Sequence, residues 1–198
     1  MKRGETVILA AGDFPRKGGV AWDLLTSAKR VVCCDSAANA YHRRFRRWPT
    51  VTVGDMDSAE DCGGLVVRIA EQDTNDLAKA VRYCAAQGWK APVILGATGK
   101  REDHTLGNVF RALDAGLEVV TDCGRFIPVE GTTTLNVRKG AAVSVFATDR
   151  GTKVRSKGLE WPLDGVTFEN LYCATLNRAK AARITLTASK RILIYVAS

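Results

Sequence analysis

Residues 51–58 of this chain read VTVGDMDS: a short β-branched run, a glycine, and two aspartates separated by one residue. Comparable apolar runs recur through the first half of the sequence, at residues 7–11, 31–34, 65–69, 93–95 and 117–121. Amphipathic stretches lie between them, and apolar residues follow the i, i+3, i+4, i+7 spacing of a helix at 77–84 and 106–113. This alternation predicts an α/β fold over residues 1–124, with a mainly parallel, Rossmann-like sheet and helices on both faces.

From about Gly124 onward the pattern changes. Runs with strand character, separated by turns, replace the helical spacing, and they cover residues 132–137, 141–147, 152–157, 166–169, 183–187 and 192–196. Short runs of this kind predict the strands of an antiparallel sheet. We therefore expect residues 125–198 to form a small antiparallel β-sandwich domain.

The composition is that of a globular protein, with 198 residues of which 46% are hydrophobic. No segment has the ~18 consecutive apolar residues of a membrane span, and the run Thr6–Ala11 is too short for the core of a signal peptide. The six cysteines form no C-x-x-C pair, and neither histidine lies at a zinc-finger distance from one. Reduced, structural cysteines favour a reducing compartment, so we expect a cytoplasmic protein with no membrane partner.

The net charge of +8 includes a basic tract of four arginines, Arg43, Arg44, Arg46 and Arg47. Such a tract can bind nucleic acid or another polyanion. The alternative is a solvated helix face whose other side carries Tyr41, Phe45 and Trp48. No RNA- or DNA-binding motif accompanies the tract, so the solvated face is favoured and no nucleic-acid partner is expected.

Polar residues follow the apolar runs, at the strand ends where open α/β sheets bind ligands. Asp55 and Asp57 would point the same way if the chain stays extended there, with Cα atoms roughly 6–7 Å apart. Two carboxylates so placed can hold magnesium, which takes oxygen ligands and shares its shell with water and phosphate. The pair could also be ordinary turn-forming aspartates. The polar residues at the neighbouring strand ends are needed to distinguish a metal site from a turn.

A second polar cluster follows the run at 65–69, and it leads into the predicted helix beginning near Leu77. Asp73 or Thr74 can cap that helix, and Asp76 in its first turn is favoured by the helix dipole. Capping does not account for the whole cluster, and Lys79, one turn further on, can reach a phosphate. The residues in question are Gln72, Asp73, Thr74, Asn75, Asp76 and Lys79.

A third cluster, residues 96–104, reads GATGKREDH. Its spacing is not that of a P-loop, although Gly99 permits close backbone approach and Lys100 and Arg101 supply charge for a polyphosphate. His104 is either an acid–base group or a polar contact at a helix start. Asp13, Asp35 and Asn39 add polar groups after two further strands. Together these strand ends predict a site for a magnesium-bound polyphosphate.

Read in order, these segments resemble the thiamine pyrophosphokinase family, whose motifs correspond to residues 34–39, 54–58, 72–79 and 96–108. The segment GLEWPL at 158–163 resembles a family motif of the β domain. The resemblance implies an enzyme that transfers the β,γ-pyrophosphoryl unit of ATP to thiamine and releases AMP. It also implies a homodimer with the thiamine site near the subunit interface.

The same resemblance implies roles for individual residues. Magnesium would be held by Asp55, Asp57 and Asp76, and catalysis would also involve Arg101 and Asp103. Thiamine would contact Trp161 and Asn177. The residues expected to bind the nucleotide are Asp13, Asp35, Asn39, Gln72, Thr74, Asn75, Lys79, Gly99, Lys100 and His104.

The sequence departs from the family pattern in two places. Ser36-Ala37 replaces a glycine pair, and Leu176 and Arg178 flank Asn177 where the family has a serine and an acid. Two alternatives stay open, the first because of the second departure and the second because of the basic tract Arg43–Arg47. One is a pyrophosphokinase of the same fold that acts on another hydroxyl-bearing heterocycle, and the other is a non-catalytic polyanion-binding module.

Overall fold

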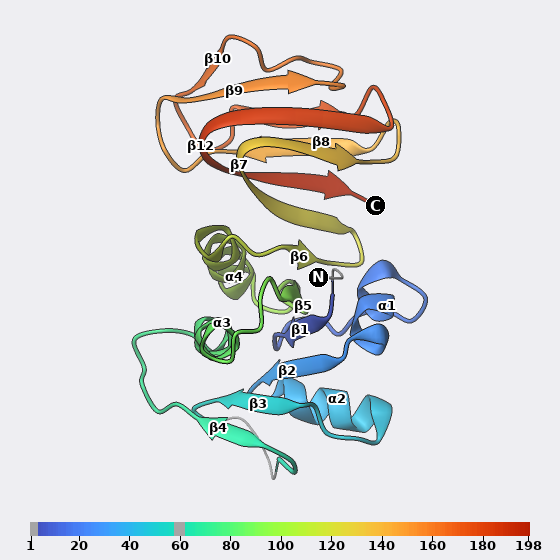
Figure 1. The fold of residues 1–198 in the computed structure, drawn as a ribbon, viewed down its shortest axis with the longest axis vertical. Helices are drawn as coiled ribbons and strands as arrows, with labels where there is room; N and C mark the ends of the chain where they lie inside the picture. The colour runs from blue at the N-terminus through green and yellow to red at the C-terminus, as the bar shows by residue number, and fades with distance from the viewer. Residues whose placement is uncertain (1–3, 58–61) are drawn as a thin grey trace. The chain divides into compact units, whose positions relative to one another are not determined.

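A computed structural model of the chain describes residues 4–57 and 62–198. The chain divides into two compact units, Met1–Asp122 and Cys123–Ser198. The first unit contains both helices and strands, and the second contains strands without helices among its described residues (Figure 1). This confirms the predicted α/β class with a β-rich C-terminal part.

The first unit is built on a parallel sheet in the order β6-β5-β1-β2-β3-β4. From β1 the chain proceeds outward through β2, β3 and β4, and it then returns to the other side of β1 to form β5 and β6. The order therefore reverses next to β1, and ligands bind at the carboxyl ends of the strands at such a reversal. The strands are β1 Thr6–Leu9, β2 Arg30–Cys34, β3 Val51–Gly54, β4 Val66–Arg68, β5 Val93–Leu95 and β6 Val119–Val120.

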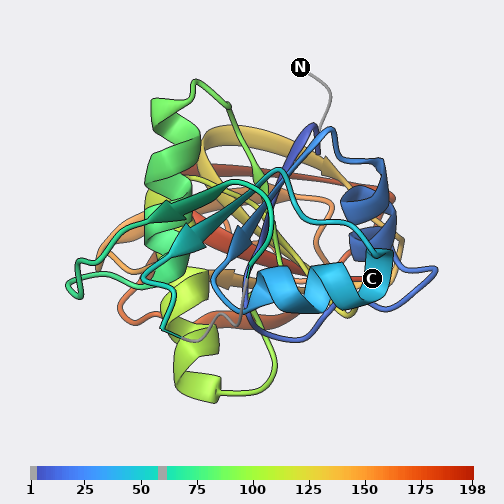
Figure 2. The same ribbon diagram turned by 90° about the horizontal axis from the view of Figure 1, so that it is seen from below.

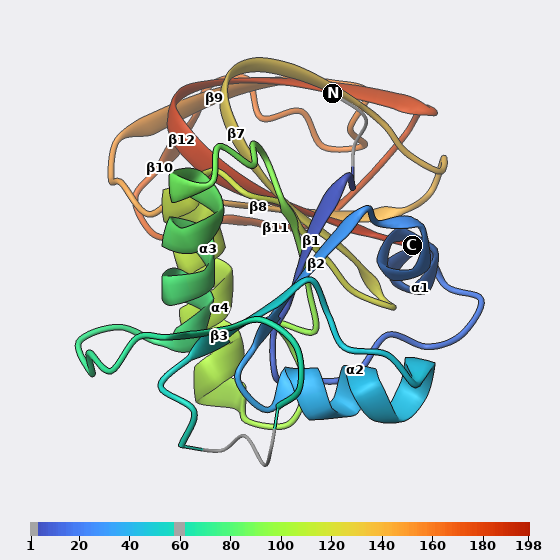
Figure 3. The same cartoon turned by 60° about the horizontal axis from the view of Figure 1, so that its bottom comes forward.

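Helices cover both faces of this sheet, with α1 and α2 on one side and α3 and α4 on the other (Figures 2 and 3). Side chains that alternate along β1 and β2, such as Val7, Leu9 and Val31, pack against α1 and α2 in one apolar cluster. On the opposite face α3 packs against β1, β2 and β3. The helices are α1 Val20–Ser27, α2 Ala37–Phe45, α3 Asp76–Ala86 and α4 Glu102–Ala115.

The second unit is antiparallel throughout its described pairings. Its two longest strands, β7 (Gly124–Asn136) and β12 (Arg183–Ala197), pair along most of their lengths. The other neighbour of β12 changes along the strand: Thr185–Ala188 pairs with β9, and Leu193–Val196 pairs with β8. Two layers therefore share these strands, and their inward side chains form one apolar core that includes Ile184 and Ile194. The strands are β7 Gly124–Asn136, β8 Ala142–Phe146, β9 Thr152–Lys157, β10 Val166–Phe168, β11 Ala174–Arg178 and β12 Arg183–Ala197.

Four elements differ from the sequence prediction. Strand β7 begins at Gly124, whereas the sequence predicted a strand only from residue 132. The runs at 183–187 and 192–196 are one strand, β12, because the chain passes through an irregularity between Ala188 and Ile192 rather than a turn. Helix α1 was not predicted, and neither was β11, whose sequence ATLNR lacks a clear apolar alternation.

Three of the six cysteines, Cys33, Cys34 and Cys84, are buried in the first unit. Burial raises the pKa of the Cys84 thiol to about 12 and raises the pKa of the other two thiols as well. These side chains are therefore neutral packing groups at physiological pH. In the part of the chain that the structure describes, no helix combines the length and apolar character needed to cross a bilayer.

Candidate active site

Three aspartates from different parts of the sequence meet at the carboxyl edge of the parallel sheet. Asp35 follows β2, Asp55 follows β3, and Asp76 is the first residue of α3. One carboxylate oxygen of each lies within 4.8 Å of those of the other two. The neighbouring order of β2 and β3 brings the first two together, and the packing of α3 against both strands adds the third.

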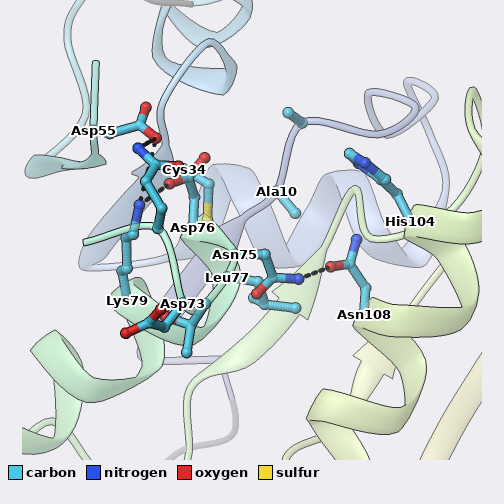
Figure 4. Close-up of a pocket in the computed structure, with 13 residues that line it drawn as sticks. Ala10, Cys34, Asp55, Asp73, Asn75, Asp76, Leu77, Lys79, His104 and Asn108 are labelled. Carbon is cyan, nitrogen blue, oxygen red and sulfur yellow. Dashed lines mark hydrogen bonds and ion pairs between the residues drawn. The ribbon is translucent and has the colours of Figure 1, made fainter. Parts of the chain in front are cut away.

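Lys79 supplies a positive charge to this cluster. Its Nζ lies 3.1 Å from Asp76 Oδ1 and 3.6 Å from Asp55 Oδ2, and only 1% of its side chain is exposed (Figure 4). Burial opposes the charge, but the hydrogen bond and charge of Asp76, together with Asp55, outweigh burial and raise the pKa of Lys79. The lysine is therefore a buried cation that offsets the repulsion among the carboxylates.

The position of Asp55 is fixed by several hydrogen bonds. The Asp57 backbone N–H donates to Asp55 Oδ1 at 3.1 Å, and Gln72 Nε2 donates to Asp55 Oδ2 at 3.1 Å. The Asp57 N–H, followed by Gln72, lowers the pKa of the Asp55 carboxyl. Arg68 Nε also donates to the Asp55 carbonyl at 3.0 Å. Asp55 is thus held as an ionised group.

The expectation of extended backbone from Asp55 to Asp57 is wrong. Strand β3 ends at Gly54, and Met56 has a left-handed φ of 69°, so the chain turns directly after Asp55. Asp57 is exposed, and its carboxylate is not one of the three that the described residues gather. Ser58, the last residue of that motif, lies outside the described residues.

Asn75 links the start of α3 to α4. Its side-chain oxygen accepts from the Ala78 N–H at 3.0 Å, so Asn75 is the N-cap of α3 rather than Asp73 or Thr74. Its Nδ2 donates to Asn108 Oδ1 at 3.1 Å (Figure 4). Asn108 Nδ2 in turn donates to the Ala97 carbonyl at 3.1 Å. This chain of bonds joins both helices to the loop after β5.

A cavity of about 370 Å³ opens beside these groups. It is lined by all six polar residues of the second sequence cluster, and by His104 from the third. Thr74 also bonds Glu71 and Arg82, which fixes its hydroxyl at the cavity wall. The lining residues are Ala10, Ala11, Cys34, Asp55, Gln72, Asp73, Thr74, Asn75, Asp76, Leu77, Lys79, His104 and Asn108.

The glycine-rich loop after β5 lies against the loop after β1. The Gly12 N–H donates to the Gly96 carbonyl at 2.7 Å, and the Asp13 N–H donates to the Thr98 carbonyl at 2.8 Å. Gly99 has a φ of 79°, and a Cβ there would lie 2.1 Å from Asp13 Oδ2. Glycine is therefore required at this position by both conformation and space, and Asp13 contacts this loop.

Lys100, which follows Gly99, donates from Nζ to the Ala11 carbonyl at 2.7 Å. The lysine ammonium is thereby held over the junction of the two loops. Its backbone also has a positive φ, 57°.

Arg101 and Asp103 form an ion pair at the start of α4, with contacts of 3.1 Å and 2.6 Å. The hydrogen bond from Arg101 lowers the pKa of Asp103 to about 2. Because 64% of the Asp103 side chain is exposed, solvent screens the pair. A carboxyl with so low a pKa is a weak proton acceptor near neutral pH.

Asn39 and Asn108 show where the sequence interpretation was incomplete. Asn39 accepts a contact from Cys62 Sγ at 3.8 Å, and it is not among the described residues that line the 370 Å³ cavity. Asn108 was not singled out, although it lines the cavity. Its spacing of one helical turn from His104, on a polar strip of α4, was the available signal.

The second unit contains the two residues expected to bind thiamine, and they contact one another. Asn177 Nδ2 donates to the Trp161 carbonyl at 2.7 Å, and the Trp161 N–H donates to Asn177 Oδ1 at 3.3 Å. Asn177 is 5% exposed, whereas 57% of Trp161 is exposed. The amide of Asn177 therefore holds the backbone of Trp161 while the indole faces out of the core.

Comparison with known proteins bears on what these two units are. Residues 21–120 match the thiamin pyrophosphokinase catalytic domain, and residues 124–195 match the thiamin pyrophosphokinase substrate-binding domain. Thiamin pyrophosphokinase 1 of Caenorhabditis elegans is 26% identical over 199 residues, which cover 89% of this chain and 82% of that protein.

Solved structures share the fold. A thiamin pyrophosphokinase from Geobacillus thermodenitrificans has a TM-score of 0.77 at 22% identity, covering 98% of this chain and 96% of that one. A thiamin pyrophosphokinase family protein from Enterococcus faecalis has a TM-score of 0.79 at 13% identity, covering 100% of this chain and 99% of that one.

A parallel α/β sheet that gathers carboxylates, a buried ammonium and a glycine-rich loop at its carboxyl edge defines a transferase of phosphate-containing groups. The two domain matches together span most of the sequence. The chain belongs to the thiamin pyrophosphokinase family.

Proposed function

We propose that this protein transfers the β,γ-pyrophosphoryl unit of ATP to the hydroxyethyl oxygen of thiamine, giving AMP and thiamine diphosphate. The observation that carries the proposal is the convergence of Asp35, Asp55 and Asp76 on the carboxyl edge of the sheet, beside Lys79. Pyrophosphoryl transfer needs positioned charge more than covalent catalysis, and this cluster offers it.

The donor set fits magnesium. Three carboxylates within 4.8 Å of one another offer only oxygen ligands, which magnesium prefers, and the adjoining cavity leaves room for phosphate. Asp35, Asp55 and Asp76 would hold the ion, with Asp57 as a further ligand through water. When bound, magnesium neutralises polyphosphate charge.

The chain's own residues have distinct tasks in this proposal. Lys79 and Gln72 keep the Asp55 carboxylate in place, and the Asn75–Asn108 pair fixes the two helices that border the cavity. The Gly99–Lys100 segment supplies close backbone approach and positive charge for phosphate, and Asp13 supports it. Arg101, Thr74 and His104 border the nucleotide, and Asp103 orients Arg101 rather than accepting the hydroxyl proton.

The two parts of the chain divide the substrates between them. Residues 1–124 bind the nucleotide and carry catalysis, and residues 125–198 bind thiamine and form the homodimer. Trp161 offers an exposed indole face to the cationic heterocycle, a contact that contributes about 0.5–2 kcal/mol. The buried thiols of Cys33, Cys34 and Cys84 fit a cytoplasmic, reducing location.

A second candidate is pyrophosphorylation of another hydroxyl-bearing heterocycle. It is favoured by Leu176, which is 87% exposed with a φ of 65° next to Asn177. An apolar side chain so exposed next to Asn177 offers a different surface from the serine of the family pattern.

One assay separates these functions. The purified protein is incubated with ATP, magnesium and either thiamine, another hydroxyethyl heterocycle or no acceptor, and the products are separated by chromatography. We expect AMP and thiamine diphosphate in equal amounts only with thiamine. AMP that forms only with the other acceptor favours the second candidate, and absence of turnover with every acceptor rejects the enzyme and leaves a polyanion-binding module.

A further inference from the structure

A smaller recess of about 120 Å³ lies next to the main cavity, and both have Ala10 and Ala11 as walls. Its other walls come from the loop after β1, the start and middle of α2, and the loop after β5. Gly12, Ser36 and Ala37 leave room in it, and Arg43 and Lys100 bring two positive charges. None of the described residues that line this recess is acidic.

The two cations differ in how they are held. Lys100 donates to the Ala11 carbonyl, which uses one of the three donors of its ammonium. Arg43 is exposed, and within residues 4–57 and 62–198 no hydrogen bond or ion pair engages its guanidinium. Both groups therefore have donors available for an anion in the recess.

The basic tract of α2 is not uniform. The Arg44 guanidinium lies 5.1 Å from the centre of the Trp22 ring, and that of Arg47 lies 5.9 Å from the Phe45 ring. These arginines pack on aromatic faces. Arg43 is exposed like the rest of the tract, and it is the member of the tract that lines the small recess.

A third, wider hollow of about 480 Å³ continues from the small recess and shares Phe14, Ala40 and Arg43 with it. Phe14 and Arg44 line it, and an aromatic ring and a planar guanidinium are groups on which a nucleobase can stack. The order along the sheet edge is thus carboxylates, then two cations, then a stacking surface.

We propose that the small recess binds the α-phosphate of the donor nucleotide through Arg43 and Lys100, with the base lying toward Phe14. This assignment rests on the proposed function, since it orients ATP with its β- and γ-phosphates toward Asp35, Asp55 and Asp76. Arg43 then determines affinity for ATP and for the AMP that leaves.

The orientation agrees with the charge changes of the reaction. The thiamine oxygen forms a bond to the β-phosphorus while the bond from that phosphorus to the α,β-bridging oxygen breaks. The bridging oxygen leaves with AMP and keeps the bonding electron pair, and the hydroxyl proton of thiamine is released to a base. Negative charge therefore grows on the α-phosphate, next to Arg43 and Lys100, where it is stabilised most.

The test measures AMP binding by calorimetry, at about 0.15 M salt so that long-range charge effects are screened. The variants are Arg43→Met and, as a matched control, Arg46→Met, which removes the same charge from an exposed position outside these recesses. We expect Arg43→Met to weaken AMP binding and raise the KM for ATP about tenfold or more, the usual scale for a lost charged hydrogen bond. Arg46→Met and the KM for thiamine should stay within about twofold of wild type. Adenosine, which lacks phosphate, should bind wild type and Arg43→Met equally.

Equal AMP affinities for Arg43→Met and Arg46→Met would overturn the assignment. A loss of adenosine binding in Arg43→Met as large as its loss of AMP binding would overturn it as well. AMP binding is measured without turnover, so the two proposals fail separately. If the protein forms thiamine diphosphate but Arg43→Met leaves AMP binding unchanged, only the assignment of the recess is rejected. Arg43-dependent AMP binding without any thiamine turnover rejects the proposed reaction and keeps the recess as a nucleotide site.

Discussion

The Lys79 ammonium lies 3.1 Å from the Asp76 carboxylate, one turn earlier on the same helix, and almost none of the lysine side chain reaches solvent. Asp55 is the second acid within reach of Lys79. This relationship makes Lys79 the internal counter-ion of the carboxylate cluster, and it leads to the first prediction.

Lys79→Met should lower the rate of thiamine diphosphate formation about 100-fold or more, the scale seen when one electrostatic donor is removed from an active site. It should also destabilise the fold by about 1–3 kcal/mol, less than for a fully buried pair because the carboxylates keep some solvent contact. Urea unfolding in EDTA measures the second effect.

Magnesium should restore more stability to Lys79→Met than to wild type, because the ion replaces the missing positive charge. Lys90→Met, which removes an exposed lysine beyond the end of α3, serves as the control and should behave like wild type. A Lys79→Met protein as active as the Lys90→Met protein would remove Lys79 from the site.

Asp57→Asn should nearly abolish activity, if Asp57 assists the metal site through water, and should change the free energy of unfolding by less than about 0.5 kcal/mol because the side chain is exposed. Steady-state turnover and urea unfolding measure the two quantities. Asp23→Asn, at an exposed aspartate of α1, is the matched control. Wild-type turnover in Asp57→Asn would show that the turn after Asp55 directs Asp57 away from the chemistry.

Asn177→Ala should raise the KM for thiamine without changing the KM for ATP, because it releases the backbone of Trp161. It should cost about 1–3 kcal/mol of stability, since two backbone groups of Trp161 lose their partner. Trp161→Ala should raise the same KM, and the double variant should be little worse than Trp161→Ala alone. Additive effects of the two substitutions would mean that Asn177 touches thiamine itself.

The Asp103 carboxyl should titrate near pH 2 in carboxyl-detected NMR, because Arg101 lowers its pKa to about 2. The folded pKa lies below the unfolded value of about 3.9, so the pair stabilises the protein above about pH 4 and loses that effect as the pH falls through 2. In Arg101→Met the midpoint should move up toward the ordinary value. An unchanged midpoint in that variant would mean that Arg101 is not the cause.

Much of the first unit was predictable because its strands are short apolar runs, each followed by a polar end. The predicted run at 93–95 has the same bounds as β5, Val93–Leu95. The parallel pairing of β2 and β3 explains why Asp35 and Asp55, which follow these strands, lie close together. The geometry after Asp55 was not predictable, because a left-handed turn at Met56 depends on the Asp55 side chain accepting the Asp57 N–H.

Other features depend on local competition between caps or on long-range contacts. Asn75 rather than Asp73 or Thr74 caps α3, and all three residue types suit that position. The polar run between Ala188 and Ile192 resembles a turn, yet β12 continues through it because β7 pairs with both halves. The contact between Asn177 and Trp161 joins residues 16 positions apart, which periodicity does not report.

The most direct test of pyrophosphoryl transfer follows an isotopic label placed on one phosphate of ATP. Thiamine and magnesium are incubated with the protein and with ATP labelled at either the α- or the γ-phosphate. The γ-label should appear in thiamine diphosphate, and the α-label should remain entirely in AMP. An α-label in the thiamine product, or ADP with thiamine monophosphate from the γ-labelled nucleotide, would contradict transfer at the β-phosphorus.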